Sequence, residues 1–343
     1  MLPADAKRVA IIQPLPGIGD MIWHLPHIRA IAAVVGEPVT LVAKPRSTAA
    51  ELFDGEATVR DVLWLDRNPE RQRGRHDGAT GFGRLVVALR RHAFDAVVVL
   101  HHSRMLAAAT LVAGVPHRFG YGFGLQRLFL NRPPFLHRPQ LCLHPYEQAT
   151  AWLVAAAIPL EQPEPTLFVT TARRGAARRR LSDTIGPMVA IGIATSEAYK
   201  QWGAAQFAEL ATVLLDSGWE LLVLAGGPAE TELAGTIRQL LGERAGRVRA
   251  ALGWKLGELA ALLAEAAFYV GNDTGVMNLA AAVGTRTYGL FGAVPPFHHS
   301  HVILPILPPD GRPDIPTGMA RITTQAVLDT IRADRGSLGP GPA

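Results

Sequence analysis

Residues 8–20 read RVAIIQPLPGIGD, and this stretch predicts the fold of the first half of the chain. The apolar run at residues 9–12 is too short for a membrane span or for the core of a signal peptide, so we interpret it as a buried strand. A glycine-containing loop follows it, and residues 21–35 have the pattern of a helix. A strand, a loop and a helix in this order begin a βαβ unit.

The same alternation continues through the first half of the chain. Unbroken apolar strands are typical of parallel sheets that are covered on both faces. Residues 119–145 are rich in Gly, Pro, Arg, Phe and His, and we expect long loops there before a helix at 146–157. Prolines at 159, 163 and 165 mark a linker. The remaining predicted elements are strands at 39–43, 62–65 and 96–100 and a helix at 82–92.

A second series of strands and helices follows a basic helix at residues 172–181. Its strands are predicted at 189–193, 220–225, 247–252, 267–270 and 287–291, and its helices at 204–217, 230–241, 255–264 and 275–283. A last helix at 323–333 precedes a Gly- and Pro-rich tail from Gly336, which we expect to be disordered. The pattern predicts an α/β protein with two Rossmann-like doubly wound domains facing across a cleft, at residues 1–165 and 166–322, followed by the helix and tail at 323–343.

Composition limits the classes of protein that fit. The length of 343 residues suits two domains of about 150 residues each. A single cysteine, Cys142, allows no intramolecular disulfide and no cysteine metal cage, which fits a reducing compartment, and no apolar stretch reaches the length of a membrane span. We therefore expect a cytoplasmic protein.

Positive charge is clustered at residues 67–75 and 173–180, in a chain of net charge +5. Neither cluster is interleaved with aromatic residues or accompanied by a nucleic-acid motif, so we expect no nucleic-acid partner. The main interpretation is a solvated helix face. Peripheral contact with the inner face of a membrane, or with a phosphorylated acceptor, stays open as an alternative.

The first chemical motif is the loop that contains Gly17, Gly19 and Asp20. The glycines allow close backbone approach, and the helix start offers unpaired N–H groups to a polar ligand. The third glycine of the dinucleotide fingerprint would fall on Ile22, so a dehydrogenase is a minor alternative. Asp20 either caps the helix or presents a carboxylate that takes a proton from a hydroxyl.

Two further motifs follow the first two strands of the second half. Thr195, Ser196 and Lys200 offer hydroxyls and an ammonium group, which suit phosphate oxygens and the charge on a departing nucleotide. Glu230 follows the Gly226-Gly227 pair, where an acidic side chain accepts hydrogen bonds from ribose hydroxyls.

The last motif, Asp273-Thr274-Gly275, lies between a strand and a helix. It combines a cap with a nest of N–H groups, which favours a pyrophosphate. The Asp273 carboxylate more plausibly orders backbone amides or binds a hydroxyl. Because the carboxyl ends of parallel strands lie at one edge of a sheet, we predict that these three motifs converge on a nucleotide diphosphate.

Taken in order, the motifs resemble those of glycosyltransferase family 9, whose best-known members are the ADP-heptose:lipopolysaccharide heptosyltransferases. The resemblance runs from Ile11 to about Gly292. Its strongest parts are Gly17, Ile18, Gly19 and Asp20 with Pro26; Lys200, Gln201 and Trp202; Gly226 and Gly227 with Glu230; Asp273, Thr274 and Gly275; Ala282, Val283 and Gly284; and Leu290, Phe291 and Gly292.

This resemblance implies a GT-B fold and inversion at the sugar carbon, with no metal and no cofactor. It implies transfer of heptose from ADP-heptose, a substrate, to a hydroxyl of a saccharide or glycoconjugate acceptor. By similarity, Asp20 is the base, Gly17 and Gly19 form the acceptor-side loop, and Lys200 offsets the charge of the leaving group. The donor-binding residues that the resemblance implies are Thr195, Ser196, Lys200, Glu230, Asp273, Thr274, Gly275 and Asn278.

One position departs from the family pattern. The family has a histidine where this chain has Asn278, and an amide donates hydrogen bonds but carries no charge. His298, His299 and His301 are alternative candidates for that ligand, and with no carboxylate or cysteine beside them we expect no metal. Two other functions stay open: a sugar-nucleotide epimerase or hydrolase on the same fold, and a nucleotide-sugar-binding module that has lost activity.

Overall fold

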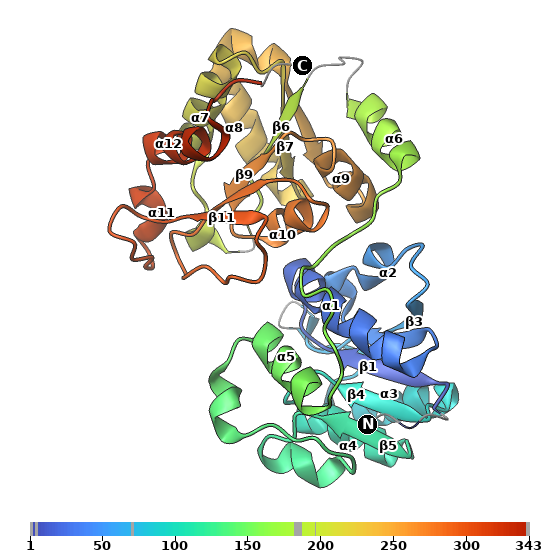
Figure 1. Ribbon diagram of the computed structural model, residues 1–343. Helices are drawn as coiled ribbons and strands as arrows, with labels where there is room; N and C mark the ends of the chain where they lie inside the picture. The colour runs from blue at the N-terminus through green and yellow to red at the C-terminus, as the bar shows by residue number, and fades with distance from the viewer. Residues whose placement is uncertain (1–2, 4–5, 70–71, 182–186, 196, 341–343) are drawn as a thin grey trace. The chain divides into compact units, whose positions relative to one another are not determined.

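A computed structural model describes residues 3, 6–69, 72–181, 187–195 and 197–340. The chain divides into two compact units, Met1–Pro165 and Thr166–Ala343, which we call the N-terminal and C-terminal units. Each unit is a parallel sheet with helices on its faces (Figure 1).

The N-terminal unit is built around β1, Val9–Gln13, which is buried along its whole length. Its sheet has the order β3-β2-β1-β4-β5, and all strand pairs are parallel. Helix α1 packs against α5, and α3 packs against α4. The other strands are β2 Val39–Ala43, β3 Val59–Trp64, β4 Ala96–Val99 and β5 His117–Gly120. The helices are α1 Ile18–Val35, α2 Ala49–Leu52, α3 Gly78–His92, α4 Arg104–Val112 and α5 Pro145–Ala155, with the 3-10 helices η1 Pro45–Ser47, η3 Gly124–Phe129 and η4 Arg138–Cys142.

The C-terminal unit has a six-stranded sheet in the order β11-β10-β9-β6-β7-β8. The chain leaves β6 toward β7 and β8, then returns to place β9 on the other side of β6, so the strand order reverses between β6 and β9. The strands are β6 Met188–Gly192, β7 Leu221–Gly226, β8 Val248–Leu252, β9 Tyr269–Asn272, β10 Thr287–Leu290 and β11 Ile303–Ile306. The helices are α6 Thr171–Leu181, α7 Ala204–Asp216, α8 Thr231–Leu241, α9 Leu256–Leu263, α10 Gly275–Ala282, α11 Gly318–Arg321 and α12 Thr324–Arg335, with the 3-10 helices η5 Ala198–Lys200, η6 Pro228–Glu230 and η7 Gly242–Arg247.

Aromatic rings fill part of the core of the C-terminal unit. Phe268 meets Trp219 and Tyr288 edge to face, with ring centroids 5.5 Å apart in each pair. The indole N–H of Trp219 donates to the carbonyl of Leu338 at 2.6 Å, and the Leu338 side chain is buried. Residues 336–340 therefore pack against their own unit, in contrast to the disorder expected from Gly336.

Several elements differ from the pattern expected from sequence. Helix α1 begins at Ile18, which places Asp20 inside its first turn. The sequence pattern predicts no strand at β5 or β11, and both lie at sheet edges. Strand β5 carries polar residues, and β11 contains Pro305, which is typical of an edge strand because proline has no N–H to donate.

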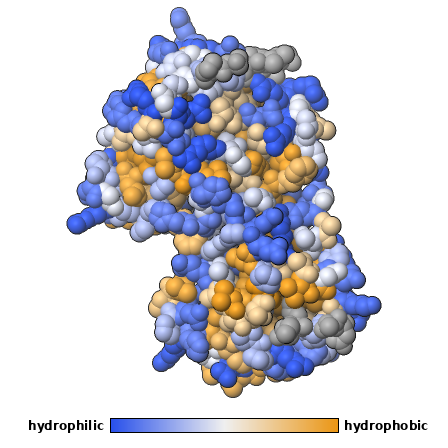
Figure 2. All heavy atoms as spheres, viewed as in Figure 1, coloured by the Kyte–Doolittle hydropathy of each residue, from blue (hydrophilic) through white to orange (hydrophobic). Residues whose placement is uncertain are grey.

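Apolar side chains also reach the surface, as the orange patches on both units in Figure 2 show. The most exposed are Phe168, Leu128 and Val154, at 88%, 73% and 72%. Single exposed apolar residues are common on protein surfaces. None of the helices within the described ranges has the length and hydropathy that a bilayer span requires.

The close approach of β6 and β9 leads to a prediction about Gly271. A Cβ atom there would lie 2.4 Å from the carbonyl oxygen of Gly192, a backbone atom that cannot move aside. We expect Gly271→Ala to lower the free energy of unfolding by about 1–3 kcal/mol, measured by urea denaturation.

Gly235→Ala is the matched control, because Gly235 lies in α8 and the added methyl group would meet no atom within 4 Å beyond its own turn of helix. This variant is expected to gain about 0.5–1 kcal/mol. Equal stability of Gly271→Ala and the wild-type protein would contradict the close strand packing.

Candidate active site

The carboxyl ends of β6 and β9 are joined by the side chain of Asn272, the last residue of β9. Its Nδ2 donates to the carbonyl of Ala194 at 3.2 Å and to Oε1 of Gln201 at 3.1 Å. Its Oδ1 accepts from the backbone N–H of Trp202 at 3.2 Å, and the amide is fully buried. Asn272 thereby fixes the loop that follows β6. Open α/β sheets bind ligands at such a reversal of strand order.

This fixed loop brings Lys200 to Asp273. Lys200 ends η5, Asp273 follows β9, and Nζ lies 2.8 Å from Oδ2. The two side chains are only 17% and 16% exposed, so water screens the pair less than it screens a surface ion pair. The structure thus brings two predicted donor-site residues into contact. The carboxylate of Asp273 holds the ammonium group of Lys200 in place.

Glu230 ties the loop after β7 to the loop after β6. Its Oε2 accepts from the N–H of Gly227 at 2.8 Å, and its Oε1 accepts from the N–H of Thr195 at 3.5 Å. The side chain of Glu230 is buried, and these two bonds hold the two loops together. The Thr195 hydroxyl donates to the carbonyl of Glu197 at 2.7 Å. Ser196 lies outside the described residues.

The motif that contains Thr274 starts α10. Thr274 is the N-cap, Gly275 is the first helical residue, and Nδ2 of Asn278 donates to the carbonyl of Thr274 at 3.0 Å. The hydroxyl of Thr274 is buried and has no hydrogen-bond partner among the described residues. The N-terminus of α10 therefore lies beside the Lys200–Asp273 pair with a buried hydroxyl unsatisfied.

His299, one of the three histidines expected as alternatives to the family's histidine, also contacts this motif. Its Nε2 lies 2.8 Å from Oδ1 of Asn278, and both side chains are buried. His298 and His301 are exposed. A histidine thus reaches the position where this chain departs from the family pattern. Within the described part of the chain, no group of three or more His, Cys, Asp or Glu residues could hold a metal ion.

In the N-terminal unit, Asp20 closes the first turn of α1. Its Oδ2 accepts from the N–H of Gly17, the N-cap, at 2.9 Å. A Cβ atom on Gly17 would lie 2.7 Å from that oxygen, so glycine makes room for the carboxylate. Asp20 therefore caps the helix as expected. It lies inside the first turn, and Gly17 is the N-cap residue. Gly19 is buried beside it.

His24 supports this turn from one turn further along α1. Its Nδ1 donates to the carbonyl of Asp20 at 2.6 Å. Burial lowers the pKa of His24 to about 4, so the ring is neutral at pH 7. The turn that presents Asp20 is thus held by a buried, uncharged side chain.

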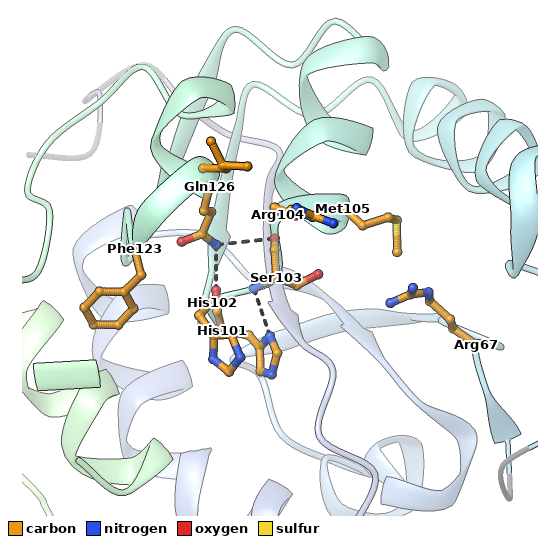
Figure 3. Close-up of a pocket in the computed structure, with 9 residues that line it drawn as sticks. Arg67, His101, His102, Ser103, Arg104, Met105, Phe123 and Gln126 are labelled. Carbon is orange, nitrogen blue, oxygen red and sulfur yellow. Dashed lines mark hydrogen bonds between the residues drawn. The ribbon is translucent and has the colours of Figure 1, made fainter. Parts of the chain in front are cut away.

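A cavity of about 450 Å³ opens where the loops after β4 and β5 meet (Figure 3). Gln126 joins the two loops, because its Nε2 donates to the carbonyl of His101 at 2.7 Å and its Oε1 accepts from the N–H of Gly122 at 2.9 Å. Burial lowers the pKa of His101 to about 4. The lining residues are Arg67, His101, His102, Ser103, Arg104, Met105, Phe123, Leu125 and Gln126.

Arg67 also lines a second cavity of about 410 Å³, together with Lys44 and Arg73. Burial, and then the like charge of Arg67, lower the pKa of Lys44. Among the described residues of this lining Asp77 is the acidic one, and its Oδ1 lies 3.3 Å from Nε of Arg67. The two cavities therefore favour anionic groups. The arginine cluster at 67–75 was one sequence signal of these cavities, although a solvated helix face was the main interpretation of it.

The sequence of this chain matches that of a known family. The sequence model of glycosyltransferase family 9 (heptosyltransferase) matches residues 82–303. Lipopolysaccharide heptosyltransferase 2 of Escherichia coli K12 is 27% identical over 271 residues, which cover 72% of this chain and 77% of that protein.

Solved structures confirm the predicted GT-B fold. The structure of E. coli ADP-heptose lipopolysaccharide heptosyltransferase II matches with a TM-score of 0.76 and 23% identity, and the match covers 95% of this chain and 98% of that one. E. coli heptosyltransferase WaaC with ADP-2-deoxy-2-fluoro heptose matches with a TM-score of 0.71 and 23% identity, over 95% of this chain and 99% of that one. The chain belongs to glycosyltransferase family 9, and the protein is a glycosyltransferase of the heptosyltransferase type.

Proposed function

We propose that this protein transfers heptose from ADP-heptose to a hydroxyl of a saccharide or glycoconjugate acceptor, with inversion and without a metal or cofactor. The observation that carries the proposal is the Lys200–Asp273 pair beside the N-terminus of α10, at the reversal of strand order in a family 9 chain. A structural relative is described in complex with a fluorinated ADP-heptose, which supports this choice of donor.

In this proposal the C-terminal unit holds the donor. Lys200 offsets the charge of the diphosphate, and the N–H groups and hydroxyls of the loops at Thr195, Ser196 and Thr274 to Gly275 donate to its oxygens. Asp273 orients Lys200 and faces the donor sugar. Glu230 has further lone pairs for ribose hydroxyls in addition to its two backbone bonds.

The N-terminal unit supplies the base. The carboxylate of Asp20 takes the proton of the acceptor hydroxyl while the hydroxyl oxygen attacks the anomeric carbon. The bond between that carbon and the diphosphate oxygen breaks, and the electron pair leaves with the nucleoside diphosphate. Attack opposite to the leaving group inverts the sugar carbon. Gly17 and Gly19 leave space for the acceptor at this turn.

The acceptor in this proposal carries phosphate or carboxylate groups, because Arg67 lines both cavities of the N-terminal unit. Lys44, Arg73 and Arg104 add positive charge around it. An acceptor anchored in a membrane would bring this unit to the inner face of the bilayer, where anionic lipids attract basic residues.

Replacing the proposed base tests the mechanism. Asp20→Asn keeps the size of the side chain but removes the proton acceptor, so we expect kcat for transfer to fall by about 10²- to 10⁴-fold. ADP affinity should change by less than about twofold, because the residue does not bind the donor in this account. Release of ADP from ADP-heptose, followed with and without acceptor, measures the rate.

Glu37→Gln is the control for Asp20→Asn, since Glu37 is an exposed partner of Arg60 in the same unit. Unchanged transfer by Asp20→Asn would contradict the assignment of the base. ADP or heptose release at the same rate without acceptor would favour an epimerase or hydrolase. Binding of ADP-heptose without turnover on any acceptor would favour a binding module.

The cationic cavities lead to a second prediction. Arg67→Gln should raise the KM for heptose-free lipopolysaccharide about tenfold or more, because hydrogen bonds to charged groups contribute about 1.5–3 kcal/mol. The KM for ADP-heptose should not change. Arg60→Gln, an exposed arginine of β3, is the control. Equal KM values for wild-type protein and Arg67→Gln, with intact and with phosphatase-treated acceptor, would exclude the anionic subsite.

A further inference from the structure

His299 lies in the segment between β10 and β11, yet its ring reaches α10. The Nε2 atom lies 2.8 Å from Oδ1 of Asn278, and the Nδ1 atom lies 3.0 Å from the carbonyl oxygen of Phe297. The ring stacks on that of Phe297 with centroids 5.3 Å apart and an interplanar angle of 11°. These contacts fix the position and the tilt of the imidazole.

The contacts also define the protons on the ring. Nδ2 of Asn278 donates to the carbonyl of Thr274, so the amide is oriented with its oxygen toward His299. Nε2 must therefore donate a proton to that oxygen. Nδ1 faces another oxygen, the carbonyl of Phe297, and must donate as well. A neutral imidazole has one N–H group and an imidazolium has two, so this arrangement suits the imidazolium.

An imidazolium at this place favours an anionic ligand nearby. Asn278 lies in the first turn of α10, and helix N-termini carry partial positive charge, which disfavours a cation. The carboxylate of Asp273, which precedes Thr274 in the chain, is paired with Lys200. His298 and His301, the other titratable groups of the segment, are exposed. The Thr274 hydroxyl at the same turn is buried and makes no hydrogen bond of good geometry within the described residues, so it can turn toward a ligand.

We propose that His299 is a positioning residue for the diphosphate of the donor: it orients Asn278 and through it the first turn of α10, and it supplies the positive charge that an amide at position 278 lacks. This inference rests on the proposed function, because the anion it serves is the diphosphate of the sugar nucleotide. In this pair Asn278 fixes the geometry of the first turn of α10, and His299 supplies the positive charge.

Calorimetric titration of the full chain with ADP and with AMP tests the proposal. His299→Gln keeps hydrogen bonding but removes the charge, and we expect ADP binding to weaken about tenfold while AMP, which lacks the second phosphate, changes less than about twofold. His299→Lys should recover part of the ADP affinity. His298→Gln, in the same segment but exposed, should bind both nucleotides like the wild-type protein.

Nitrogen NMR of the imidazole rings gives a measurement that a merely structural role would not affect. The signal absent from His299→Gln should show two protonated nitrogens in the ADP complex. A neutral ring in that complex, or equal ADP affinity of wild-type protein and His299→Gln, would overturn the inference. If the wild-type protein bound no ADP, the proposed function would fail instead. If His299→Gln did not fold, the signal absent from His299→Lys would identify the His299 ring, and its protonation in the wild-type ADP complex would decide.

Discussion

The hydrogen bonds of the buried Asn272 amide determine the shape of the proposed donor site. They join the end of β9 to the loop that follows β6, at the one place in this sheet where the strand order reverses. A buried polar group left without partners costs about 1–3 kcal/mol, so the amide favours one arrangement of the loop strongly. The Lys200–Asp273 pair exists because that loop is fixed.

A few hydrogen bonds also hold the turn that contains Asp20. One carboxylate oxygen accepts the N–H of Gly17, and the absence of a side chain on Gly17 leaves room for it. His24 supports the same turn from inside the unit while staying neutral, because burial lowers its pKa to about 4. The N-terminal unit therefore presents a rigidly held carboxylate and the C-terminal unit a rigidly held ammonium group.

Much of the fold could be predicted from sequence because the central strands are unbroken apolar runs, as at β1, β6 and β7. The edge strands β5 and β11 could not be predicted, since polar residues and Pro305 interrupt their pattern. The sequence pattern predicts a later start for α1 than the structure shows, because Gly17 at the N-cap and Gly19 in the first turn disfavour a helix in isolation. The local sequence pattern predicts most strands and helices correctly. It fails at the two edge strands and at the start of α1, where contacts with the rest of the unit determine the structure.

The candidate site was predicted as a set of residue types at strand ends, without their contacts. Lys200 and Asp273 are 73 residues apart, and Asn278 and His299 are 21 residues apart on either side of β10. No local pattern predicts which of these side chains meet. Asn272 carried one signal, a polar residue at the end of a buried strand, but its partners in the loop after β6 required the structure.

Hydrogen–deuterium exchange of the full chain with and without ADP tests the central claim, that the nucleotide diphosphate binds at the ends of β6, β7 and β9. The account predicts slower exchange of backbone amides in residues 193–203, 226–231 and 273–278 when ADP is bound. Unchanged exchange in all three segments at saturating ADP, or protection confined to residues 14–20 of the N-terminal unit, would contradict it.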